Sequence, residues 1–115
     1  MYANAATDLI IDINGYFAAP GTGGLSLYNL TPCRVLDTRV PAGSQPFNGE
    51  LDVNVEASAC APPAASQAFV FNATVVPPGA LGFLTLWPQG TTRPIVSTLN
   101  AVDGQITSNM SIGWK

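Results

Sequence analysis

The chain has 115 residues, of which 47% are hydrophobic and only 10% are charged, with a formal net charge of −3, and this length fits a single domain with its own core. Its four basic residues are scattered and its apolar runs are shorter than the roughly 18 residues of a membrane span, so we expect neither nucleic-acid binding nor membrane insertion. Because typical soluble domains have about 25% charged residues, this composition favours a secreted protein, extracellular or assembled on a cell surface.

The first predicted element is a strand over 7–17, TDLIIDINGYF, in which apolar and polar residues alternate. Residues 18–24, AAPGTGG, have the composition of a flexible linker. We therefore expect an N-terminal strand (1–17) detached by this linker from a body over 25–115. The large apolar residues that this strand must bury are Leu9, Ile11, Ile13, Tyr16 and Phe17.

The rest of the chain predicts short strands, because ten Pro and eleven Gly punctuate it and no helical periodicity is present. Asn48-Gly49 predicts a turn, and two hairpins are expected, over 67–87 and around Asp103-Gly104. The count of seven or eight strands indicates an all-β fold, an antiparallel β-sandwich of jelly-roll or Ig-like type. The predicted strands cover 25–39 with a break at Pro32, 51–55, 67–76, 81–87, and 94–102 and 105–114 flanking Asp103-Gly104.

The chain has two cysteines, Cys33 and Cys60, and no His, so the usual Cys/His zinc sites cannot form. The cysteines form either a disulfide or two buried thiols, and the low charge content favours the disulfide. The bridge would close a loop of 28 residues, counting both ends. Such a bridge stabilises by roughly 3–4 kcal/mol on the chain-entropy model and indicates an oxidising compartment.

No catalytic constellation is present, and we expect a protein that is not an enzyme and needs neither cofactor nor metal. A catalytic triad lacks its His, and a Ser–Lys pair would have to use Lys115, the last residue. A carboxylate pair could serve a glycosidase, but the Asp residues lie on separate predicted strands and turns. The favoured interpretation is that these Asp residues lie on solvated strand faces and in turns.

The motif RVLDTR places three charged residues, Arg34, Asp37 and Arg39, in a sequence with few charges. A ligand-binding Arg/Asp pair is one interpretation. The favoured interpretation is a structural ion pair that fixes the strand after Cys33, because charges in so apolar a chain are usually partnered.

Two tryptophans and three tyrosines could form a platform on which sugar rings stack. At strand ends and Gly turns such residues more often anchor a core or an interface, and this is the favoured interpretation. The aromatic residues concerned are Trp87, Trp114, Tyr2, Tyr16 and Tyr28.

Three N-glycosylation sequons begin at Asn29, Asn72 and Asn109. They fit exposed polar strand faces of an extracellular protein. Asn and Thr are also common on polar β-faces without any glycan, so both interpretations stay open.

Four phrases together resemble a tandem β-sandwich repeat of large secreted bacterial surface proteins. They are TPCRVLDTR, NATVVPPGALGFLTLWPQG, STLNAVDGQITSN and TDLIIDINGYF, and they span nearly the whole chain. The resemblance implies extracellular, β-rich modules of structural or adhesive character in a tandem array. It implies no catalytic residues.

In that repeat the phrase DLIIDINGYF closes a unit, whereas here it comes first. The strand over 7–17 could therefore complete a neighbouring subunit, belong to the preceding module of a continuous array, or fold back to complete its own domain. We favour the two neighbour arrangements, because a seven-residue linker reaches at most about 25 Å.

The expected function is a structural module of an extracellular filament or surface array, joined head to tail by the N-terminal strand. Its expected partners are copies of itself. The alternative is a secreted carbohydrate-binding or adhesive domain, whose partners would be glycans.

Overall fold

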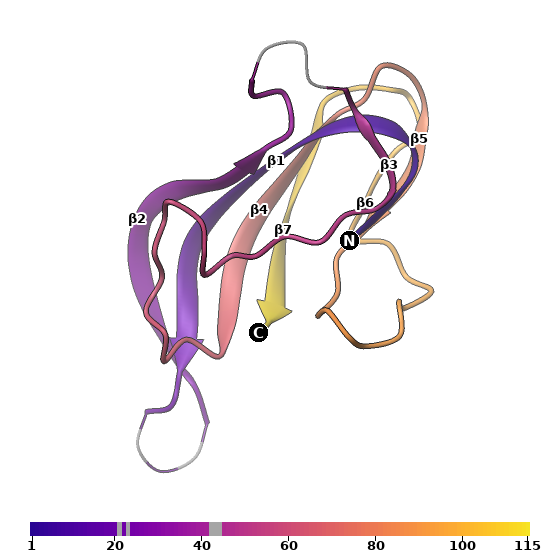
Figure 1. Ribbon diagram of the computed structural model, residues 1–115. Helices are drawn as coiled ribbons and strands as arrows, with labels where there is room; N and C mark the ends of the chain where they lie inside the picture. Colours follow the sequence, from indigo (N-terminus) through magenta and orange to yellow (C-terminus); the bar gives the residue numbers. More distant parts are fainter. Residues whose placement is uncertain (21, 23, 42–44) are drawn as a thin grey trace.

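The computed structural model describes residues 1–20, 22, 24–41 and 45–115, without the side chains of Asn14 and Phe17, and this part of the chain forms strands and no helix (Figure 1). All strand pairs are antiparallel, which confirms the predicted all-β, sandwich-like fold. The seven strands are β1 (Tyr2–Ala18), β2 (Ser26–Asp37), β3 (Phe47–Glu50), β4 (Ala68–Val76), β5 (Leu81–Thr85), β6 (Leu99–Ala101) and β7 (Thr107–Trp114).

The strand β1 is the longest and belongs to both halves of a bent sheet. Its first residues, from Tyr2 to Thr7, pair with β3 on one side and β5 on the other. The following residues, from Asp8 to Ala18, lie between β2 and β4. The strand β6 extends the first half beyond β5, and β7 extends the second half beyond β4. Figure 1 shows β1 running through the sheet and bending towards the N-terminus.

The core lies between the two halves and is built from alternate residues of the paired strands. On β1 and β4 the facing pairs include Leu9 with Val75 and Ile13 with Phe71. Alternate residues of each strand reach the core, because every second side chain of a strand points to the same side of the sheet. The buried apolar cluster comprises Ala3, Leu9, Ile11, Ile13, Phe69, Phe71, Ala73, Val75, Leu81, Leu84, Leu99 and Ala101.

Both predicted hairpins are wrong. The strands β4 and β5 do not pair with each other, because β1 pairs with both and the Pro77–Gly79 turn carries the chain from one half of the sheet to the other. The same holds around Asp103-Gly104, where β6 pairs with β5 while β7 pairs with β4. The turn itself is present, and Gly104 has a φ of 73° and donates its N–H to the Ala101 carbonyl at 3.0 Å.

Two further expectations around residues 47–55 are corrected. Asn48 and Gly49 lie within β3 rather than in a turn, and Gly49 accommodates a φ of 85° there. The predicted strand over 51–55 keeps its alternation of half-buried and exposed residues but is not paired beyond Leu51. Leu51 exchanges two backbone hydrogen bonds with Met1, at 3.0 and 3.1 Å.

Candidate assembly strand and adjoining groove

The strand β1 carries the residues that the sequence assigned to assembly. Leu9 and Ile13 have no exposed surface, and Ile11 is also buried. Tyr16 is half-buried and stacks on Tyr28 of β2, with ring centroids 5.2 Å apart. The backbone of Phe17 pairs with both neighbouring strands, and its side chain lies outside the described part of the chain.

In this structure of one chain, residues 7–17 complete the chain's own sheet, the third of the three expected arrangements. Ala18 pairs with Ser26, so residues 19–25 form the loop that joins β1 to β2. Gly21 and Gly23 of the predicted linker lie outside the described residues. The predicted linker thus connects two strands that pair with each other, and β1 is not detached from the body.

The predicted disulfide between Cys33 and Cys60 is confirmed, with a Cα–Cα distance of 5.7 Å. It joins β2 to the long segment over 51–67, which crosses in front of β4 (Figure 1). Val53, Val55 and Cys60 of this segment pack against the buried cluster. The bridge therefore holds an unpaired segment over the core.

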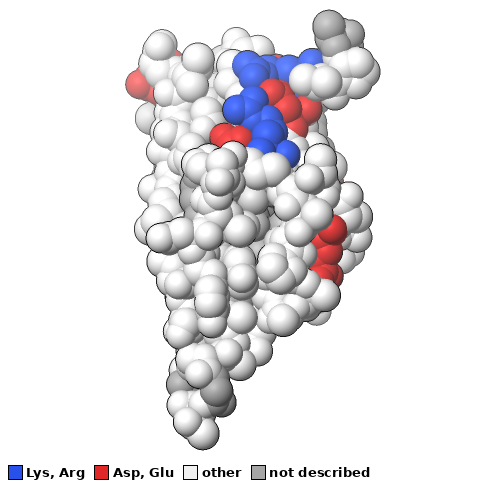
Figure 2. Space-filling view, turned by 90° about the vertical axis from the view of Figure 1, so that its left-hand side faces the viewer, with Lys and Arg blue, Asp and Glu red and all other residues white. Residues whose placement is uncertain are grey.

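The charged residues of RVLDTR lie together at the end of β2 and contact β1. Arg34 pairs with Asp12 of β1 at 2.8 Å and with Asp37 at 3.1 Å, and Arg39 pairs with Asp37 at 2.8 Å. Figure 2 shows a compact patch of mixed charge on this side of the molecule. The hydrogen bonds from Arg39, together with those from Arg34, hold the pKa of Asp37 well below its usual range. The arrangement fastens the end of β2 to β1.

A groove of about 590 Å³ lies beside β1, between the sheet and the segment over 50–56. Its floor consists of Ile11, Phe69 and Phe71, and its other wall is the loop over 86–91 together with the end of β7. Two contacts cross it, from Gln89 to Asp52 at 3.1 Å and from Lys115 to Glu56 at 2.6 Å. The sequence analysis did not predict this groove. No local pattern indicates it, because the residues that line it come from segments far apart in the chain.

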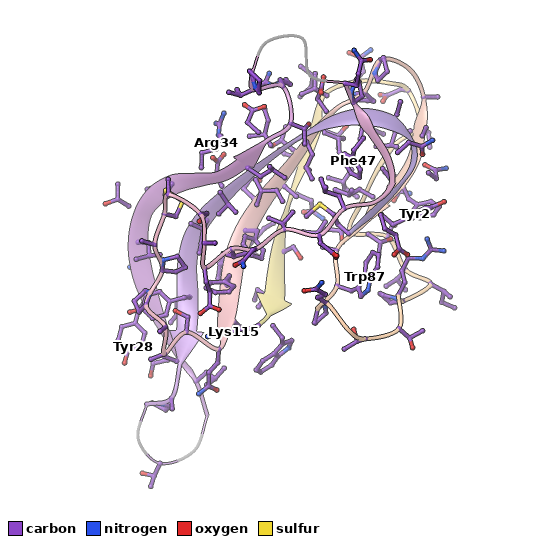
Figure 3. The ribbon with its side chains drawn as sticks, viewed as in Figure 1. Tyr2, Tyr28, Arg34, Phe47, Trp87 and Lys115 are labelled. Carbon is purple, nitrogen blue, oxygen red and sulfur yellow. A yellow bond between two sulfur atoms is a disulfide. The ribbon has the colours of Figure 1, made fainter. Side chains whose placement is uncertain are left out.

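The five aromatic residues considered for a sugar platform lie at different places and do not form one surface. Trp87 and Trp114 both line the groove, and Trp114 is 62% exposed. Figure 3 labels Trp87, which lies in the loop that follows β5. Tyr2 instead stacks on Phe83, with ring centroids 5.6 Å apart, and also carries the guanidinium of Arg93 over its ring. Tyr16 and Tyr28 stack on each other away from the groove. The platform is thus reduced to the two tryptophans.

The three sequon asparagines lie in different surroundings. Asn29 is exposed on β2, whereas Asn72 is half-buried on the interior strand β4. Asn109 is exposed on β7, but its side-chain amide donates to the Thr98 carbonyl at 2.8 Å. Asn29 is therefore the most accessible candidate acceptor of a glycan.

Comparison of the chain with models of known families, with curated proteins and with solved structures found no match. The described residues contain no helix that is long and apolar enough to cross a membrane. Over the same ranges, no group of three or more His, Cys, Asp or Glu side chains could hold a metal ion.

Proposed function

We propose that the chain is a non-catalytic structural module of an extracellular filament or surface array, whose copies join head to tail by exchanging β1. The observation that carries this proposal is the place of β1 in the sheet. It is central in both halves of the sheet, and one loop over 19–25 connects it to the strands that follow it. A strand connected in this way to its following strands is suited to domain swapping between identical copies.

Exchange would preserve the contacts that stabilise the single chain. In a neighbouring copy, β1 would find the same β2 and β4 edges and the same buried partners for Leu9, Ile11 and Ile13. If each copy gives its strand to the next and receives one from the previous, the contact is heterologous and propagates into a fibre. The disulfide is compatible with a secreted or extracellular location.

Deletion of residues 19–24 tests the exchange directly. In the structure Ala18 pairs with Ser26, so this deletion leaves Leu25 as the single residue between them. A hairpin connection needs at least two residues, so β1 can no longer fold back beside β2 of its own chain. We expect the shortened protein to form folded oligomers in light scattering and electron microscopy, with the same circular dichroism per residue as wild type.

The matched control replaces residues 19–24 by six Gly and Ser residues, which keeps the length and should keep the monomer in dilute solution. A shortened protein that is a folded monomer, or that does not fold at any concentration, would contradict the proposal.

Carbohydrate binding in the groove is a second candidate function. Trp87 and Trp114 line one open cavity, and amide and carboxylate groups of Gln89, Asp52 and Glu56 lie beside them. Aromatic faces with nearby polar groups suit the binding of sugar rings. Binding to a glycan array that disappears in Trp114→Ala, with the fold intact, would support this candidate, and an array without any binding would remove it.

A further inference from the structure

The second half of the sheet, in the order β2-β1-β4-β7, ends in two edges that are protected to different degrees. On β2 the pairing with β1 shifts register twice, Pro32 lies within the strand, and Cys33 anchors it to the crossing segment. Arg34 adds a charge at the same edge. Register irregularities, Pro and charged side chains are the means by which proteins prevent further strands from pairing with an edge.

The opposite edge, β7, has none of these protections. Its eight residues pair with β4 without a register shift and include neither a charged residue nor a Pro. On the face away from the core it exposes Met110 (63%) and Ile112 (51%), and Trp114, at the end of the strand beside the groove, is 62% exposed. A long, regular and uncharged edge strand is a template for pairing with another strand.

On the side away from β4, no strand of the described residues pairs with β7. The loop that follows β5 extends past β7 on the side away from β4 (Figure 1), and the groove lies between this loop and the end of β7. Ile95 and Val96 of this loop are exposed, at 105% and 65%. An added strand would lie beside β7 above this apolar loop.

We propose that β7 of one copy pairs antiparallel with β7 of a second copy around a two-fold axis, giving one sheet that continues through both molecules. A second copy is the favoured occupant of this edge, and β7 is the strand that it would offer, because its β2 edge is protected against pairing. Two β7 strands can lie side by side without repulsion, since neither has a charged residue that would meet a like charge. The antiparallel direction also brings Lys115 of each copy towards the Asp103 turn that precedes β7 of the other.

This interface uses no part of β1 and goes beyond the head-to-tail exchange. The exchange would extend a chain of modules lengthwise, whereas β7 pairing would join two such chains, or two monomers, side by side. Loss of one interface therefore leaves the other measurable.

Met110→Lys in the full-length protein tests the pairing. The substitution removes an exposed apolar side chain from β7 and places like charges near each other across the two-fold axis. In analytical ultracentrifugation we expect a wild-type monomer–dimer equilibrium and a dissociation constant raised by roughly tenfold or more in the variant. The matched control is Val40→Lys, which places the same charge at a residue that is 71% exposed beyond the end of β2, and should dimerise as wild type does.

Single cysteines test the geometry independently. Ser108→Cys, Met110→Cys and Ile112→Cys lie on one face of β7, and under mild oxidation at least one of them should form a covalent dimer that retains its circular dichroism spectrum. Leu27→Cys on β2 should not. Wild type that stays monomeric at millimolar concentration, dimerisation that Met110→Lys leaves unchanged, or covalent dimers through β2 instead of β7 would overturn the proposal.

Discussion

A chain that lacks residues 1–17 is expected to be unfolded at every temperature. The deletion takes away the strand with which β2, β3, β4 and β5 all pair. It also removes the buried side chains of Leu9, Ile11 and Ile13. At about 1.5–3 kcal/mol for each, their burial contributes roughly 5–9 kcal/mol, which is comparable to the whole stability of a small domain. Far-UV circular dichroism and a thermal scan would measure the loss.

The same experiment can be reversed by supplying the strand separately. A synthetic peptide of residues 1–18 is expected to bind the truncated chain in a one-to-one ratio and to restore a cooperative thermal transition, because it supplies the strand with which β2 and β4 pair when the chain folds. A control peptide with Ile11→Asp should not restore folding, since it would bury an unpaired carboxylate. A truncated chain that unfolds cooperatively without any peptide would show that β1 is dispensable for the fold.

The second large effect is expected from removing the disulfide. The sequence separation of Cys33 and Cys60 is 27, for which loop-closure entropy gives roughly 3–4 kcal/mol. The segment over 51–67 has few other attachments, among them the hydrogen bond from Lys115 to the Ala64 carbonyl at 2.9 Å. We expect the Cys33→Ser/Cys60→Ser variant to melt at a temperature lower by about 10–20 °C, measured by calorimetry.

Wild type in the presence of a reductant is the control for this variant and should melt at the same temperature as the double variant. A melting temperature within a few degrees of oxidised wild type would show that the segment over 51–67 is held by its packing on the core and not by the bridge.

The class of fold was predictable because it depends on local patterns. The alternation in LIIDI and AFVFNATVV and the Pro- and Gly-rich turns between strands suffice to indicate an antiparallel all-β protein. The pairing of strands was not predictable in the same way. Both hairpin predictions assumed that neighbours in sequence pair, but β1, about 60 residues before β4, takes the position between them. Turn residues determine where the chain reverses direction, but they do not determine which strand pairs with which.

The candidate site was predictable to a similar degree. The pairing of Cys33 with Cys60 follows from there being two cysteines in a chain with few charges. The groove arises where β1 ends between the segments over 51–55 and 86–91, and the protection of β2 arises from register shifts. Both depend on contacts between distant parts of the chain, and no local pattern encodes them.

The central position of the N-terminal strand also determines the order in which the fold can form. During synthesis β1 and its neighbour β2 both emerge before β4 and β5, which are complete only after residues 68–85 have been added. Until then β1 lacks the strand that flanks it opposite β2, and contacts of such long sequence separation form slowly. Each newly made molecule is thus expected to pass through a period in which one side of β1 is unpaired.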